Sequence, residues 1–343
     1  MKLRIKNPLS KGKVAFEAYN PFIHGVRQSN LQNWLTCREM ARLNVLQGWS
    51  SIFSGMPLVY GSLSHGVLKQ VYRNLRDAKA NRKLTKTDLC HDSVIAVLIK
   101  ESEDEVMKEH PNPPSSLLET KEEACAILAG TLPSYFNKWW EEDNAVKWDM
   151  VEDKFAVPLT MRDGAIIPLT GTFDATFKKR GGTWLFETKN KARWSQKIGS
   201  LLPLDLQLGI YLTVMEMKYK VRPTGVRYNL MRRPGERRGK NESLMDYAAR
   251  IAGNCAKDPD HYFERIEMEL LQSEHDEHVR RTTYLVQEFY DWWKLVDHTA
   301  RDLMWNSGSC ETKYGECHYL DLCANNDTSM YRHRPRDKVD SLL

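Results

Sequence analysis

Residues Ile166-Ile-Pro-Leu-Thr-Gly-Thr-Phe-Asp174-Ala-Thr-Phe177 and Trp184-Leu-Phe-Glu187 are rich in apolar, β-branched and aromatic side chains. The charged, glycine-bearing segment Lys178-Lys-Arg-Gly-Gly182 separates them, which predicts two strands joined by a turn. We therefore expect Asp174 and Glu187 to lie side by side on paired strands. Two carboxylates at that distance repel each other unless a cation intervenes, and hard oxygen ligands favour Mg²⁺ or Mn²⁺ over zinc.

A lysine and a glutamine–tyrosine pair follow the two acids. Lys189 stands two positions after Glu187 and so projects from the same strand face. Its ammonium is suited to orienting an attacking water and offsetting charge on a phosphorane, and an ordinary salt bridge to the acids is the alternative. Gln207 and Tyr211 share one face of an expected helix over 203–219 that is apolar almost all round. A buried amide needs partners, which fits either an active-site role or a satisfied core position.

Hydrophobic periodicity predicts two helices before the strands. Ser29 is a plausible N-cap for a helix over 30–47, which contains Cys37. A second helix is expected over 60–79 and carries His65. A lone histidine on a helix is usually structural or exposed, so its role depends on what lies beside it.

The remaining elements follow from composition and helix signals. The stretch 100–116 is charged and contains prolines, which indicates a surface connection. Pro203 suits the first turn of the helix after the strands, because its missing N–H has no helical partner there. The other expected elements are a helix over 118–143, strands from 148 to 187, a strand over 225–231 and helices over 242–255 and 276–306. This order predicts an α/β fold in which helices flank a central sheet.

The length and composition indicate one elaborated domain. A chain of 343 residues with 41% apolar composition can bury a substantial core. We expect that domain over 1–326, with its core at about 145–231 and a helical region from 29–143 and 242–323. The basic segment 327–343 is expected to be a flexible tail.

Charge and the N-terminal segment bear on partners and location. The net charge of +5 suggests a polyanionic partner without requiring one. No run of 18 apolar residues occurs, and Met1-Lys-Leu-Arg-Ile-Lys-Asn-Pro8 lacks the apolar core of a signal peptide, so no membrane association is expected. We expect a cytoplasmic protein, in which the seven cysteines are free thiols or metal ligands.

Taken together, these features resemble the PD-(D/E)XK nuclease superfamily, and within it the RecB-like branch whose members carry an iron–sulfur cluster. That branch includes the AddB nuclease domain, CRISPR-associated exonucleases and phage exonucleases. The resemblance spans residues 29–325 and depends on the order of five elements, because an Asp followed by Glu-x-Lys occurs by chance in many sequences. The five elements are Tyr60-Gly-Ser-Leu-Ser-His65, Gly171-x-x-Asp174, Glu187-x-Lys189, Gln207-x3-Tyr211 and the set Cys37, Cys310, Cys317 and Cys323.

The resemblance implies a restriction-endonuclease-like fold, with a central mixed sheet, flanking helices and an added helical region tied by the four cysteines. It implies that one or two Mg²⁺ or Mn²⁺ ions bind at His65, Asp174, Glu187 and the carbonyl of Thr188. The small residues Gly61, Ser62, Ser64 and Gly66 would let the histidine helix approach the sheet. The implied catalytic set is Asp174, Glu187, Lys189, Gln207 and Tyr211, with the glutamine holding the lysine, water or phosphate and the tyrosine contacting DNA.

The cysteines form a set split between the two ends of the chain. Cys310, Cys317 and Cys323 lie within fourteen positions, and Cys37 would complete a group of four. Four thiolates suit a [4Fe-4S] cluster or structural zinc, and the resemblance favours the cluster in a structural role. The interval between Cys310 and Cys317 is longer than in many members, and His318 is an alternative ligand for zinc. The other three cysteines, expected to be small buried apolar residues, are Cys90, Cys125 and Cys255.

Two basic groups are candidates for DNA binding, with a simply solvated surface as the alternative. The turn group is Lys178, Lys179 and Arg180. The loop group is Arg232, Arg233, Arg237, Arg238 and Lys240.

We expect a Mg²⁺- or Mn²⁺-dependent DNA exonuclease that acts on ends or single strands in phage or bacterial recombination, replication or repair. The location would be the bacterial cell or the phage-infected host. No G-x-x-x-x-G-K-[ST] segment occurs, so unwinding would need a separate helicase, and a single-strand-binding or recombination protein is a second expected partner. The alternatives are an endonuclease that trims DNA for CRISPR adaptation or packaging, and a catalytically silent DNA-binding scaffold.

Overall fold

The structure is a computed structural model. It describes residues 17–52, 55–81, 85–86, 91–108, 113–195, 197–298, 300–302, 304–312, 315–334, 336 and 338–339.

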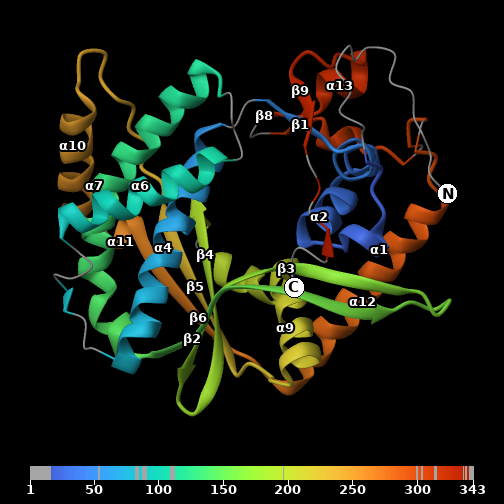
Figure 1. Cartoon of the computed structure of the whole chain (residues 1–343), viewed down its shortest axis with the longest axis horizontal. Coiled ribbons are helices and arrows are strands. Elements are labelled where there is room, and N and C mark those ends of the chain that lie inside the picture. The colour runs from blue at the N-terminus through green and yellow to red at the C-terminus, as the bar shows by residue number, and fades with distance from the viewer. Residues whose placement is uncertain are drawn as a thin grey trace.

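A five-stranded sheet forms the centre of the protein, in the order β2-β3-β4-β5-β6 (Figure 1). Strands β4 and β5 are parallel, and the other neighbouring strands are antiparallel. The expected α/β fold with a mixed sheet flanked by helices is therefore confirmed. The strands are β2 (Lys147–Thr160), β3 (Ile166–Lys179), β4 (Gly182–Lys191), β5 (Gly225–Arg232) and β6 (Phe263–Glu269).

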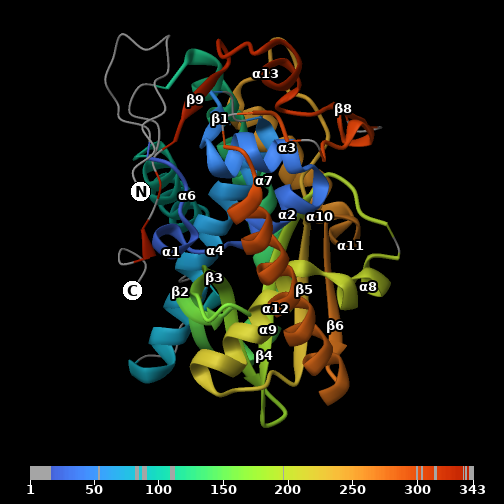
Figure 2. The same cartoon turned by 90° about the vertical axis from the view of Figure 1, so that its right-hand side faces the viewer.

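Helices cover both faces of this sheet and bury one apolar cluster on each side (Figures 1 and 2). One layer consists of α4 (Met56–Asn81), α6 (Asp92–Lys108), α7 (Ser115–Ala145) and α10 (Leu244–Lys257). The other consists of α9 (Leu206–Tyr219) and α12 (Gln272–Leu295), with the short α1 (Pro21–His24), α2 (Gln28–Thr36) and α3 (Arg38–Ala41) beside them. The crossover from β4 to β5 passes through α8 (Ile198–Leu201), the 3₁₀ turn η2 (Leu202–Leu204) and α9.

The strands β3 and β4 separate where the expected active-site acids lie. Their pairing runs from Lys179↔Gly182 to Ala175↔Phe186 and then ends, whereas β2 and β3 stay paired as far as Thr160↔Ile166. The β2–β3 ribbon therefore leaves the sheet and extends beneath α1 and α2 (Figure 1). Asp174 and Glu187 are the first residues beyond the last β3–β4 pair.

The predicted helix over 203–219 begins later than expected. Asp205 is the N-cap of α9, because its side chain accepts hydrogen bonds from the N–H groups of Gln207 and Leu208 at 2.7 and 3.1 Å. Pro203 lies in η2 rather than in the first turn of α9. Within the described part of the chain, no single helix is long and apolar enough to cross a membrane, and one bent pair, Ile198–Leu204 with Leu206–Tyr219, meets that test by length and composition only.

The predicted helix over 30–47 is broken at Cys37, and that prediction is wrong in its continuity. Cys37 has an extended backbone with φ −160° and ψ 124°, which ends α2 and starts α3. Residues Arg42–Leu46 then form a π-helix, η1. Arg27 rather than Ser29 is the N-cap of α2, since Ser29 lies inside the helix.

The expected surface connection over 100–116 is also wrong in part, because α6 continues to Lys108. Its charges lie at helical spacing, with Lys100 paired to Glu103 and Asp104 at 3.2 and 3.0 Å. The opposite face carries the buried Ser102, whose hydroxyl donates to the carbonyl of Leu63 at 2.9 Å.

Gly66 permits this close packing of α4 on α6, because a Cβ at that position would collide with Ser102. The glycine therefore serves a contact between two helices rather than the expected approach of α4 to the sheet.

The edge strand β6 was absent from the predicted elements, and it lies outside the expected core of 145–231. Its sequence, Phe263-Glu-Arg-Ile-Glu-Met-Glu269, contains three glutamates, which are uncommon in strands. Arg227 of β5 compensates one of them through bonds to Glu267 at 2.6 and 2.9 Å. The next helix, α12, ends at Leu295 rather than near residue 306.

The segments that precede α4 and follow α12 meet at one end of the molecule. Strand β1 (Trp49–Ser51) pairs with β9 (Tyr331–His333), next to α13 (Leu320–Asn325), η3 (Ser307–Ser309) and the hairpin β7 (Glu311–Thr312) and β8 (Gly315–Glu316) (Figure 2). Arg336 donates to the carbonyls of Glu17 and Leu46 at 2.9 Å. Both β9 and Arg336 belong to the segment 327–343, and whether that segment is flexible stays a prediction.

Candidate active site

Three acidic residues form a row across β2, β3 and β4. Glu152 lies between the pairs Val151↔Ala175 and Asp153↔Phe173, so it stands opposite Asp174. On the other side, Ala175↔Phe186 is the last β3–β4 pair, which places Glu187 beside Asp174. The expected proximity of Asp174 and Glu187 is therefore present, and the structure adds a third acid to them.

Glu152 was not among the residues predicted from sequence. It has a positive φ of 51° and follows an irregularity in the β2–β3 register between Trp148 and Val151. A bulge of this kind bends a strand and changes the direction of nearby side chains. An acid in the strand that pairs with Asp174 was the available signal, but the bulge that directs it into the site is not visible in the sequence.

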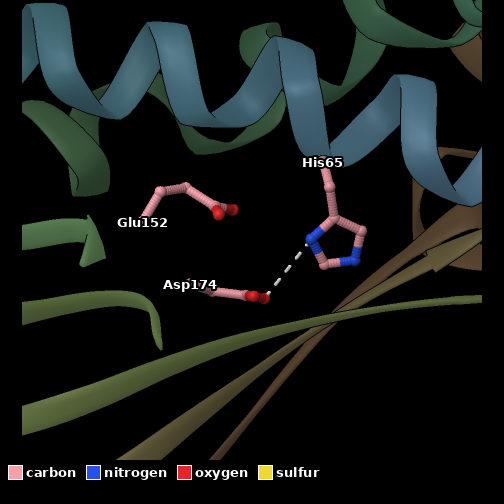
Figure 3. A group of neighbouring side chains, drawn as sticks. All are labelled: His65, Glu152 and Asp174. Atoms are coloured by element: carbon pink, nitrogen blue, oxygen red, sulfur yellow. Dashed lines mark ion pairs between the residues drawn. The ribbon is translucent and has the colours of Figure 1, made fainter. Parts of the chain in front are cut away.

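His65 of α4 closes the site from above the sheet (Figure 3). Ligand atoms of His65, Glu152 and Asp174 all lie within 4.8 Å of one another, and His65 Nδ1 is 3.6 Å from Asp174 Oδ2. Burial lowers the pKa of His65 below its ordinary value, an effect that the nearby Glu187 opposes. The imidazole is thus neutral near pH 7, which is the form that binds a metal ion.

The surroundings of Asp174 and Glu187 make ionisation of their carboxyl groups unfavourable. Asp174 Oδ2 accepts a hydrogen bond from the N–H of Thr188 at 2.7 Å, and Glu187 Oε2 is buried with no hydrogen-bond partner in the described part of the chain. Burial raises the pKa of both carboxyls, and the charge of Asp174 raises that of Glu187 further. Burial and then Asp174 raise the pKa of Glu152 to about 8. Three carboxyls that resist ionisation together are suited to a site completed by a cation.

Lys189 joins the acids to the helix α9. Its Nζ donates to Glu187 Oε1 at 2.7 Å and also to the Gln207 side-chain carbonyl. Burial lowers the pKa of Lys189, but the adjacent Glu187 carboxylate outweighs burial and the net pKa is raised, so the ammonium stays charged. Gln207 therefore holds the lysine, which is one of the roles expected for it.

Tyr211 continues this chain of hydrogen bonds away from the solvent. Gln207 Nε2 donates to the Tyr211 hydroxyl at 2.6 Å, and that hydroxyl donates to the carbonyl of Thr172 at 2.7 Å. The side chain is 6% exposed and packs at 4.8 Å, centroid to centroid, on Phe173. This placement differs from the expected DNA contact and makes Tyr211 a positioning residue between α9 and β3.

A buried polar network supports the site on the side of the sheet that α4 and α7 cover. Asn229 of β5 donates to Thr188 Oγ1 at 3.2 Å and accepts from Tyr135 and Arg265 at 3.1 and 3.2 Å. Arg265 in turn makes a bidentate ion pair with Asp143 at 2.7 and 2.9 Å. Thr188 is therefore held between Asp174 on one side and this network on the other.

Residues 28–324 match the family described as "PD-(D/E)XK nuclease superfamily". The chain belongs to the PD-(D/E)XK nuclease superfamily. A solved structure titled "Crystal structure of SSO0001" is similar at 13% sequence identity and a TM-score of 0.31, covering 76% of this chain and 96% of that one, and at this score the likeness carries no argument. No curated protein matches the sequence.

A PD-(D/E)XK protein is a phosphodiester nuclease by family, and the residues present fit the cation that such chemistry uses. The donor set combines carboxylates with one neutral imidazole, which suits Mg²⁺ or Mn²⁺. Glu187 Oε2, which has no partner among the described residues, is a buried acceptor that a cation would satisfy. When bound, such an ion lowers the pKa of a coordinated water and polarises the phosphoryl oxygen.

The structure brings the split cysteine set of this PD-(D/E)XK chain into one region. The N–H of Asn306 donates to Cys37 Sγ at 3.3 Å, and the carbonyl of the same residue is 3.9 Å from Cys310 Sγ. The N–H of Cys317 donates to the carbonyl of Cys310 at 2.8 Å. Burial raises the pKa of Cys317 and of Cys323, and the nearby Cys310 and Cys37 add to both shifts.

The other residues considered with the four cysteines are the alternative zinc ligand His318 and the remaining three cysteines. His318 is exposed, and its carbonyl accepts from the Tyr331 hydroxyl at 2.7 Å. Cys255 is buried and Cys125 is partly buried, as expected for small apolar residues. Cys90 lies outside the described residues.

The two basic groups differ in how many of their side chains form ion pairs with acids. In the turn group, Lys178 lies 3.5 Å from Asp149, Lys179 pairs with Glu267, and Arg180 pairs with Glu269 at 3.1 Å. In the loop group, Arg238 pairs with Glu123 at 3.1 Å, whereas the exposed Arg237 and Lys240 have no ion pair with any described residue. The remaining two members, Arg232 and Arg233, line a pocket.

Proposed function

We propose that this chain is a Mg²⁺- or Mn²⁺-dependent deoxyribonuclease that acts as an exonuclease on DNA ends or single strands. The observation that carries the proposal is the row of Glu152, Asp174 and Glu187 under His65, with the charged Lys189 bound to the third acid. A purely structural cluster has no use for three adjacent buried acids whose charges oppose one another.

Each residue has a role in this proposal. His65, Glu152, Asp174 and Glu187, with the carbonyl of Thr188, would hold the cation. Lys189 donates hydrogen bonds to the attacking water and offsets negative charge on the phosphate, and Gln207 fixes the direction of its ammonium. Hydrolysis leaves a 5′-phosphate and a 3′-hydroxyl.

The proposed setting is phage or bacterial recombination, replication or repair, with a separate helicase or a single-strand-binding or recombination protein as partner. We place the chain in the RecB-like branch and assign Cys37, Cys310, Cys317 and Cys323 as ligands of a structural [4Fe-4S] cluster, with zinc as the alternative. The contacts of Cys37 and Cys310 with one residue, Asn306, support this assignment. The cytoplasmic location stays a prediction from sequence.

The test uses anaerobically purified protein with end-labelled single- and double-stranded DNA and either Mg²⁺ or Mn²⁺. Cleavage should require the metal and be lost in Asp174→Asn, while Asp149→Asn, an exposed acid of the same ribbon, should cleave like the wild type. An Asp174→Asn variant that cleaves at the wild-type rate would refute the assigned active site.

The same assay separates the alternatives. Release of mononucleotides from a labelled end supports the exonuclease. Cleavage of closed circular DNA would favour the trimming endonuclease, and DNA binding without hydrolysis under any of these conditions would favour the silent scaffold.

A further inference from the structure

A pocket lies at the end of β4 and β5, outside the group of acids. It has a volume of about 440 Å³ and is lined by Ala192, Arg193, Arg232, Arg233, Gly235, Glu236, His261 and Tyr262. That volume is within the range of small-ligand pockets in proteins. Three of its lining residues are arginines, which sets it apart from the acidic site beside it.

The three arginines have no acidic partner. Among the described residues, neither Arg193 nor Arg232 nor Arg233 forms an ion pair with an aspartate or glutamate. Arg232 Nε is buried and has no hydrogen-bond partner among the residues that the structure describes. A buried guanidinium N–H without an acceptor is costly, so this group is prepared for a ligand that accepts hydrogen bonds.

Neighbouring side chains fix Arg232 in place without neutralising it. Its guanidinium lies 4.6 Å from the centre of the Trp194 ring, and its NH1 group lies 3.2 Å from His261 Nε2. Trp194 is itself held by a hydrogen bond from Nε1 to Glu264 at 2.7 Å. The positive charge is therefore oriented before any ligand arrives, which reduces the entropy lost on binding.

One acid lines the pocket, but its carboxylate is already engaged. Glu236 Oε1 accepts from Asn254 Nδ2 and from the Tyr262 hydroxyl, both at 3.1 Å. Three arginines against one glutamate leave the lining of the pocket with an excess of positive charge, so the pocket favours an anion.

The strand register connects this pocket to the candidate active site. Arg232 pairs with Lys191, which is four residues beyond Glu187 on the same strand and therefore on the same face. At about 3.3 Å per residue, the pocket begins roughly 13 Å from the acids. The turn group lies at the opposite end of β4, and its three charges already face acids.

We propose that the pocket of Arg193, Arg232 and Arg233 binds a phosphate group of the DNA substrate, one or two nucleotides from the bond that is cut. The proposal rests on the proposed nuclease function and adds the group that positions the strand. Planar guanidinium groups match phosphate oxygens in bidentate geometry. The phosphate is either an internal diester or the monoester at a DNA end, and the two sources give different experimental results.

The experiment measures binding in an Asp174→Asn background, so that hydrolysis does not interfere. The probes are three versions of one fluorescent single-stranded DNA 12-mer, with a 5′-phosphate, a 3′-phosphate or hydroxyls at both ends, and affinity is measured by anisotropy over a salt series. Arg232→Gln and Arg193→Gln remove one charge each. Arg280→Gln is the matched control, because Arg280 is exposed on α12 and also has no acidic partner among the described residues.

We expect Arg232→Gln to weaken binding about tenfold and to reduce the slope of log affinity against log salt by about 0.7, while Arg280→Gln changes neither. A monoester site gives tighter binding of one phosphorylated end, and that preference disappears in the variant. A diester site gives equal loss for all three probes. Arg193 is exposed, so Arg193→Gln shows the same pattern without disturbing the fold.

The affinity and salt slope of the Asp174→Asn parent, found unchanged in both pocket variants, would refute the proposal. The nuclease function is tested separately by the wild-type cleavage assay. If the wild type cleaves and the pocket variants bind like the Asp174→Asn parent, only the pocket assignment is wrong. If the wild type binds but never cleaves, only the nuclease proposal is wrong.

Discussion

Glu152 and Asp174 face each other across the β2–β3 pair, and the first of them holds a left-handed backbone to do so. A φ of 51° at a residue other than glycine costs roughly 1–3 kcal/mol and persists only where the surroundings enforce it. The enforcing feature is the irregular register after Trp148. The fold therefore maintains strain at the position that adds a third acid to the site.

This relationship predicts that Glu152→Gln weakens metal binding. Removing one of the acids should raise the Mn²⁺ concentration needed for half-maximal cleavage by about 10- to 100-fold, comparable to the loss of groups that support metal sites. Manganese titrations of cleavage, and of binding by calorimetry, measure the effect, with Asp149→Asn as control. An unchanged Mn²⁺ requirement would show that Glu152 is not part of the site.

A second prediction concerns Lys189 and Gln207. Lys189→Met should retain metal binding and lose turnover by about 100-fold or more, because the ammonium contributes to the transition state rather than to the metal site. Gln207→Ala should reduce turnover less. Since the glutamine acts through the lysine, the double variant should be no slower than Lys189→Met, and single-turnover rates reveal this non-additivity. Additive losses would mean that the two residues act independently.

The raised pKa values predict an unusual pH dependence of stability for the metal-free protein. The folded state keeps protons on Glu152, Asp174 and Glu187 at pH values where the unfolded chain has released them. Stability from these groups therefore falls as pH rises from about 4, near the unfolded pKa values, to about 8, that of folded Glu152. Saturating Mn²⁺ should restore more stability at pH 8 than at pH 5.

Thermal unfolding at several pH values, with and without Mn²⁺, measures this effect. In the metal-free protein, Glu152→Gln should reduce the loss of stability with rising pH, since one of the three titrating groups is gone. The assignment would be contradicted if, between about pH 4 and about pH 8, the unfolding temperature of the metal-free wild type rose relative to that of metal-free Glu152→Gln.

The buried pair of Arg265 and Asp143 gives a prediction about stability alone. Their side chains are 3% and 6% exposed, so Arg265→Met leaves an uncompensated buried carboxylate and should destabilise the protein by about 3–5 kcal/mol. Adding Asp143→Leu should recover most of that loss. Urea unfolding of the single and double variants tests the pair, and a double variant as unstable as Arg265→Met would show that the ion pair is not the cause.

The cysteine assignment predicts a colour. Protein purified without oxygen should be brown if the four thiolates hold an iron–sulfur cluster, and Cys323→Ser should bleach it, whereas Cys125→Ser should not. Iron, sulfide and zinc analyses accompany the spectrum. Colourless active protein with one zinc per chain would establish the zinc alternative.

The sequence predicted the centre of the fold well because local signals were strong there. The strands that carry Asp174 and Glu187 have apolar and aromatic residues throughout, and the turn between them is rich in charge and glycine. The histidine helix and the i, i+4 spacing of Gln207 and Tyr211 were likewise local features. The confirmed mixed sheet follows from these segments.

The missed features depend on tertiary contacts. Glu152 enters the site through a bulge, and the charged strand β6 is stabilised by arginines of other elements, such as Arg227. The helix over 30–47 breaks at Cys37, where the chain meets Asn306 from the far end of the sequence. Periodicity within a segment contains no information about such partners.

The pairing of β1 with β9 has a consequence for the order in which the protein is made. Ser50 bonds to Arg332, a residue 282 positions later in the chain. At about 5–20 residues per second, a ribosome needs roughly 15–60 s to span that interval. The contact between Cys37 and Asn306 can therefore form only after all five strands of the central sheet have been synthesised.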